Sequence, residues 1–111
     1  MRDFVELLFM LYRDARRPPL RQISSEVNES GEDSQTASTE TIRRMLHGKT
    51  IPPRLETVEA VAEALCRLAG GGIDLDSQFY YKNTDSTLRG HLERTWHRAL
   101  DEPDLVYEAP F

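Results

Sequence analysis

The stretch between Ser38 and Arg54 constrains the fold more than any other part of this 111-residue chain. The Ser38 hydroxyl can accept a hydrogen bond from a backbone N–H at a helix N-terminus, and Gly48 can adopt the left-handed conformation that closes a helix. Between them, apolar residues recur at the three- and four-residue spacing of one helical face. The stretch therefore predicts a short, well-delimited helix whose core-facing residues are Ile42, Met45 and Leu46.

The opposite face of this predicted helix is polar. Its side chains can all form hydrogen bonds to an outside partner: Thr39, Glu40, Arg43, Arg44 and His47. Lys49 and Arg54 follow the helix, on either side of a rigid pair of prolines at positions 52 and 53. A helix with one apolar face and one hydrogen-bonding face predicts a surface that recognises a partner.

Helical spacing of apolar residues also predicts helices over residues 3–16, 20 to 27 or 28, 55–69 and 86–100. Two prolines at 18 and 19 and three glycines at 70–72 end the first and the fourth of the five helices. The acidic segment 29–37 predicts a surface loop, and the tail 101–111, with two prolines, predicts an irregular end. The sequence as a whole predicts an all-α fold.

Composition limits the class of protein further. Charged residues make up 30% of the chain and hydrophobic residues 39%, which is typical of soluble globular proteins. No apolar run approaches the roughly 18 residues of a membrane span, and the N-terminus lacks the features of a signal peptide. The single cysteine, Cys66, cannot form an internal disulfide and fits a reducing compartment. We therefore expect a cytoplasmic protein without membrane contact.

The net charge of −5 is distributed unevenly along the chain. Residues 1–54 hold nine Lys and Arg against eight Asp and Glu, whereas residues 55–111 hold five against eleven. The basic groups are therefore concentrated in the half that contains the polar helix. Since their surplus there is a single charge, any attraction to nucleic-acid phosphates is expected to be weak.

The order of these elements resembles the helix-turn-helix plan of the lambda-repressor-like, xenobiotic-response-element (XRE) family, in its actinobacterial form. The matching residues are Leu20-Arg21-Gln22-Ile23 in the second helix, Ser38, Thr41, Ile42 and Met45 to Lys49 in the third, and residues 55–65 in the fourth. The resemblance covers residues 3–69. It implies a bundle of four to five helices with an extra C-terminal helix, divided into a DNA-binding domain at 1–70 and an extension at 71–111.

The resemblance also implies a function, namely sequence-specific binding of double-stranded DNA by a transcriptional regulator such as a repressor. The third helix, residues 38–47, would enter the major groove, where each base pair presents a distinct set of donors and acceptors. The implied base-reading residues are Thr39, Glu40, Arg43 and Arg44, and the implied phosphate contacts are Arg21, Ser38, Lys49 and Arg54. The acidic segment 29–37 is longer than the family's turn and would have to bulge away from the groove.

Other roles are open for several of these residues. Arg43 and Arg44 can be solvated helix residues, and Glu40 can serve only to interact with the helix dipole. Nothing in the residue spacing predicts a catalytic nucleophile, a metal site or a cofactor. His91 and His97, six residues apart, lie on different sides of a helix and cannot share a metal. We therefore expect a non-enzymatic protein.

The acidic second half offers a candidate homodimer interface within residues 73–100, made of Tyr80, Tyr81, Leu88, Leu92 and Trp96. The alternative is that the stripe around Trp96 is buried against the preceding helices. A rival function is a protein-interaction adaptor on the same scaffold, and a third is a module of a larger signalling or defence protein. Carboxylates that screen the polar face of the third helix would favour the adaptor.

Overall fold

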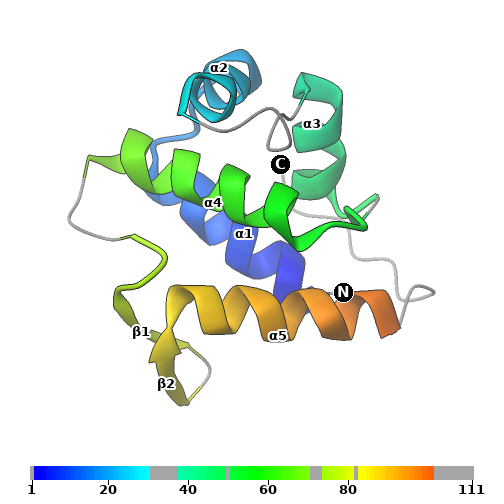
Figure 1. The fold of residues 1–111 in the computed structure, drawn as a ribbon, viewed down its shortest axis with the longest axis vertical. Coiled ribbons are helices and arrows are strands. Elements are labelled where there is room, and N and C mark those ends of the chain that lie inside the picture. Colours follow the sequence, from blue (N-terminus) through cyan, green and yellow to red (C-terminus); the bar gives the residue numbers. More distant parts are fainter. Residues whose placement is uncertain (1, 31–37, 50, 71–73, 82, 102–111) are drawn as a thin grey trace.

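A computed structural model of the chain describes residues 2–30, 38–49, 51–70, 74–81 and 83–101. These residues form five helices and one two-stranded antiparallel sheet (Figure 1). Most of the expected acidic loop and of the expected tail lie outside the described residues. In chain order the elements are α1 (Arg2–Asp14), α2 (Leu20–Ser30), α3 (Thr39–His47), α4 (Leu55–Ala69), β1 (Gln78–Tyr81), β2 (Thr84–Thr87) and α5 (Leu88–Asp101).

The described residues are mostly helical, in line with the expected all-α fold, but they also contain a β-hairpin that the sequence did not predict. β1 pairs with β2 so that Gln78 lies opposite Thr87 and Tyr81 opposite Thr84. Phe79 and Tyr81 pack against the core, whereas Tyr80 between them is 67% exposed. This alternation is the period of a strand, but it spans only four residues. Because residues 86 and 87 belong to β2, α5 begins two residues later than expected.

One hydrophobic core runs through all five helices. α1 lies in the middle of the described residues and contacts α3, α4 and α5 (Figure 1). Leu88 and Leu92 of α5 are fully buried in the same cluster as Phe4 of α1 and Leu65 of α4. The C-terminal extension therefore completes the core of the bundle rather than forming a separate unit.

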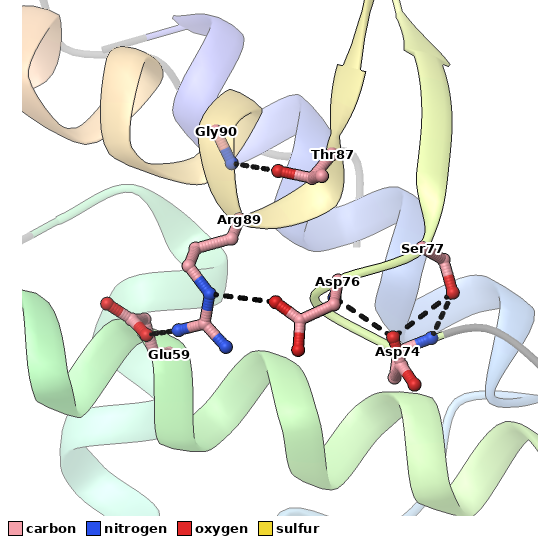
Figure 2. A network of polar contacts seen from close by, with 7 residues as sticks. All are labelled: Glu59, Asp74, Asp76, Ser77, Thr87, Arg89 and Gly90. Carbon is pink, nitrogen blue, oxygen red and sulfur yellow. Dashed lines mark hydrogen bonds and ion pairs between the residues drawn. The ribbon is translucent and has the colours of Figure 1, made fainter.

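Polar contacts fix the start of α5 to α4 (Figure 2). The Arg89 guanidinium contacts the carboxylate of Glu59 in α4 and lies 3.4 Å from the Oδ1 atom of Asp76. Asp74 Oδ1 in turn accepts hydrogen bonds from the Asp76 backbone N–H at 2.9 Å and from the Ser77 hydroxyl at 3.2 Å. Burial raises the pKa of Glu59, and this effect exceeds the opposing attraction of Arg89. The network holds the segment before β1 between α4 and α5.

Trp96 connects α5 to the segment between α3 and α4. Its indole Nε1–H donates a hydrogen bond of 2.8 Å to the backbone carbonyl of Pro52, and the side chain is only 9% exposed. A buried carbonyl needs such a donor, so this bond fixes the segment that follows α3.

None of the helices in the described ranges has the length and hydrophobicity that a membrane span requires.

Candidate nucleic-acid interface

Both ends of α3 are fixed by caps, as the sequence predicts. The backbone N–H of Thr41 donates to the Ser38 hydroxyl at 3.2 Å, and Ser38 itself is extended, with φ −79° and ψ 162°. At the other end, Gly48 has φ 73°, and its N–H bonds the Met45 carbonyl at 3.1 Å. The next N–H, of Lys49, bonds the Arg44 carbonyl at 2.9 Å. This pair of bonds is a Schellman closure, which requires the left-handed glycine.

The inner face of α3 is anchored in the core. Ile42, Met45 and Leu46 have no exposed surface, which confirms the predicted apolar face. α3 packs against α2 and α1 through this face. Because its ends are capped and its inner side is buried, the helix presents its outer side chains from a rigid position.

The outer face carries a cluster of three charged side chains. Glu40 Oε1 lies 2.6 Å from Arg43 Nη2 and 2.9 Å from Arg44 Nε, and Glu40 Oε2 accepts a hydrogen bond from Arg43 Nε at 3.1 Å. The spacings of three and four residues place all three side chains on one side of the helix. About half of each side chain is exposed. We call this group the α3 charge cluster.

The cluster is electrostatically coupled. Hydrogen bonds from Arg43, and to a lesser extent from Arg44, lower the pKa of the Glu40 carboxyl from 4.5 to about 2. Hydrogen bonding to Glu40 in turn raises the pKa of Arg43. Glu40 is therefore ionised at neutral pH, and the cluster as a whole carries one positive charge. The Glu40 carboxylate therefore screens both arginines. From the sequence, Glu40 was expected to read a base or to interact with the helix dipole.

A hollow of about 400 Å³ opens beside the cluster. Its charged lining includes Glu40 and Arg44 from α3 and Arg54 from the start of α4, and its apolar lining includes Ile51 and Pro53. The fold thus brings two expected base readers, Glu40 and Arg44, to the same hollow as one expected phosphate contact, Arg54. The sequence did not predict that Ile51 lines a hollow, because this depends on how the segment around Pro52 and Pro53 folds. We call this the α3–α4 hollow.

The other expected phosphate contacts do not line this hollow. Arg21 and Lys49 are exposed, on α2 and just after α3 respectively. The Ser38 hydroxyl is occupied at the helix cap, where it also lies 3.0 Å from the Thr41 hydroxyl. Thr39 is exposed at the first position of α3. Apart from Arg21 on α2, the expected DNA-contacting residues therefore lie on α3 and the segments next to it, with Ser38 already engaged in a local bond.

The expected dimer interface needs a correction. Leu88 and Leu92 are fully buried and Trp96 is nearly so, all within a single chain, so these side chains cannot contact a second copy. Tyr81 is half-buried and packs against the core. Among the described residues, the large hydrophobic side chains that remain exposed are Tyr80 and Leu100. The alternative expectation, burial of the Trp96 stripe against the preceding helices, is confirmed.

Comparisons of the chain with protein-family models, with curated proteins and with solved structures give no match. Within the described ranges, no group of three His, Cys, Asp or Glu side chains is arranged to hold a metal ion. Cys66 is buried, and desolvation raises its thiol pKa to about 11. A functional assignment therefore depends on the α3 charge cluster and the hollow beside it.

Proposed function

We propose that this chain is a sequence-specific DNA-binding protein and transcriptional regulator of the XRE type. In this proposal α2 and α3 form the helix-turn-helix, and α3 enters the major groove. The observation that carries the proposal is that Arg43 and Arg44 project from a helix fixed by two caps and a buried face. An arginine fork can bond both acceptors on the major-groove edge of guanine.

Glu40 has a defined part in this proposal. Among the described residues it bonds Arg44 through the Nε atom, which leaves the two terminal nitrogens of that guanidinium available to a base. Arg43 instead uses Nε and Nη2 for the carboxylate. Holding the guanidinium groups before binding reduces the conformational entropy lost on complex formation. Arg44 is therefore the better candidate for reading guanine, and Arg43 the better candidate for a supporting or phosphate contact.

The α3–α4 hollow supports the same arrangement. Arg54 lines the hollow and is exposed, with its Nε atom 4.0 Å from Glu56 Oε2. A strand whose base meets Arg44 would place its sugar and phosphate over the apolar surface of Ile51 and Pro53, within reach of Arg54. Phosphate contacts of this type set the register of a protein on DNA without reading its sequence.

The proposal is tested by selecting sequences from a genomic fragment library and measuring affinity by fluorescence anisotropy. Arg44→Gln should weaken binding to the selected site by about 1 to 3 kcal/mol and relax its base preference. Arg13→Gln, an exposed arginine at the end of α1, is the charge-matched control and should keep that preference. Absence of salt-sensitive binding by the wild type, or equal effects of the two substitutions, would defeat the proposal.

Regulators of this kind commonly bind as dimers to two half-sites about 34 Å apart. A second copy has to use exposed side chains, and Tyr80 is the most exposed large hydrophobic one among those described. Light scattering of the wild type and of Tyr80→Ser, with and without the selected DNA, measures the oligomeric state. A monomer under every condition would restrict the protein to single-site binding.

A second function, a protein-interaction adaptor, is favoured by one specific observation. The Glu40 carboxylate screens both arginines, and the chain carries a net charge of −5. Both features weaken attraction to phosphates. Affinity capture from the native host with and without nuclease separates the two functions, because a protein partner is retained after nuclease treatment whereas a DNA-bridged one is lost.

A further inference from the structure

A second polar pocket, of about 200 Å³, lies where α1, the hairpin and α5 meet. Figure 1 shows α5 and the hairpin on the side of α1 and α4 away from α2, so this pocket is distinct from the α3–α4 hollow. Neither the helix-turn-helix resemblance nor the proposed DNA binding gives it a role. We call it the α5 pocket. The described residues that line it include Asp3, Tyr81, Thr84, His91, Arg94 and Arg98.

His91 fixes the position of Arg94 in the α5 pocket. The histidine is only 3% exposed, and its Nε2 atom lies 2.8 Å from the backbone carbonyl of Phe79. A carbonyl only accepts, so Nε2 carries the proton and donates. The other ring nitrogen, Nδ1, then accepts from Arg94 Nη2 at 2.9 Å. The imidazole is uncharged in this arrangement, and it holds one edge of the guanidinium while the rest lines the pocket.

The histidine ring is itself held by aromatic side chains of the hairpin. Phe79 and Tyr81 each place a ring 5.7 Å from the His91 ring, at an interplanar angle of 71°. The Tyr81 hydroxyl also donates to the Asp3 carbonyl at 3.4 Å. Arg94 itself is exposed, but the imidazole that its Nη2 atom bonds is fixed by contacts to β1, so one edge of its guanidinium is positioned before a ligand binds.

Positive charge exceeds negative charge in the described lining of the α5 pocket. Arg98 Nη1 donates to Asp3 Oδ2 at 3.1 Å, yet the Arg98 side chain remains 62% exposed. With Arg94 added, two guanidinium groups face one carboxylate. Thr84, whose side chain has a neutral hydroxyl donor, also lines the pocket. Guanidinium groups bind carboxylates and phosphates through charge-assisted, often bidentate hydrogen bonds.

We propose that the α5 pocket binds a small free oxyanion, namely inorganic phosphate or a short carboxylate. A volume of about 200 Å³ lies below the roughly 300 to 1,000 Å³ of sites for drug-sized ligands, which favours a small anion. The anion bonds Arg94 and Arg98 of α5 in a pocket that is also lined by residues of α1 and the hairpin. A ligand that binds only the folded state stabilises it, so the anion acts on the joint between the extension and the bundle.

The test is an NMR titration of the whole chain with phosphate and, separately, with succinate, each against chloride at equal ionic strength. We expect saturable shifts of the backbone amides of Thr84, Arg94 and Arg98 with at least one of the two anions. Phosphate also stabilises proteins without binding, since it is excluded from their surfaces, so site-specific shifts rather than thermal stability alone are decisive. The titration that saturates at lower concentration identifies the preferred anion.

Matched variants complete the test. Arg98→Gln and Arg94→Gln should each weaken the anion's affinity about tenfold or more, because each removes a charged hydrogen-bond donor. Arg13→Gln removes the same charge outside the pocket and should leave the titration unchanged. Since Arg98 is largely exposed, its substitution does not threaten folding. Shifts that never saturate, or that are the same in Arg98→Gln as in Arg13→Gln, overturn the proposal, and neither result bears on DNA binding by α3.

Discussion

The α3 charge cluster and the α5 pocket each hold two arginines, but they are built in different ways. In the cluster, one carboxylate bonds both guanidinium groups, and all three residues come from the outer face of a single helix. In the α5 pocket, one arginine is held by a buried histidine and the other by an aspartate at the start of α1, more than 90 positions away. The cluster depends on local helix geometry, whereas the pocket depends on the whole fold. Substitutions that disturb one should therefore leave the other intact.

The largest expected effect concerns the core beneath α5. Leu92→Ala removes a fully buried side chain and should lower the free energy of unfolding by about 2 to 5 kcal/mol. Leu100→Ala, in the same helix but 38% exposed, is the matched control and should lower it by less than about 1 kcal/mol. Urea denaturation followed by circular dichroism measures both. A separate early transition in the Leu92 variant would show that the extension folds independently of the bundle.

A smaller effect is expected at Trp96, which links α5 to the segment between α3 and α4. Trp96→Phe keeps an aromatic ring but leaves the Pro52 carbonyl without its donor, which should lower the free energy of unfolding by about 1 to 3 kcal/mol. Because Pro52 also lines the α3–α4 hollow, the variant should change DNA affinity as well. Circular dichroism is the appropriate probe, since Trp96 is the only tryptophan. An unchanged DNA affinity would show that the α3–α4 hollow does not depend on this hydrogen bond from α5.

The N-terminal cap of α3 gives an effect confined to the first region. Ser38→Ala removes the acceptor for the Thr41 N–H and should lower the free energy of unfolding by about 1 kcal/mol. Ser38→Asp keeps a cap and should retain stability, but its negative charge should weaken DNA binding. Denaturation and anisotropy measured on both variants separate the structural role from the binding role. Equal DNA affinities for Ser38→Asp and the wild type would argue against α3 facing phosphates.

The same contrast explains what the sequence could predict. The caps and the buried face of α3 are confirmed because each depends on residues within one helix turn or two. The Glu40 contacts were within reach of the same reasoning, since carboxylate and guanidinium groups three and four positions apart meet on a helix. The α5 pocket was not, because Asp3, Tyr81 and Arg98 come together only when the chain has folded. The hairpin was missed for a related reason, as four residues are too few to establish a strand period.

The smallest effect on stability, and the sharpest on function, is expected from Glu40→Gln. Because all three side chains are half exposed, solvent screens their attraction and the free energy of unfolding should barely change at neutral pH. The folded-state pKa of about 2 lies below the ordinary 4.5, so the carboxylate's small contribution is complete above pH 4.5 and is lost as the pH falls through 2. Wild type and variant should therefore unfold alike in acid, as measured by urea denaturation across this range.

On DNA the same substitution should have opposing consequences. Releasing both guanidinium groups raises the local charge by one, so nonspecific binding should strengthen, and the slope of log affinity against log salt should steepen by about 0.9 for each phosphate gained. Preference for the selected site should fall at the same time, because the arginines are no longer held in place. Anisotropy over a range of salt concentrations measures both quantities. A stronger preference would mean that Glu40 does not position the arginines for base reading, and an unchanged salt slope would mean that this face does not meet phosphates. Either result would make the adaptor function the better account of this face.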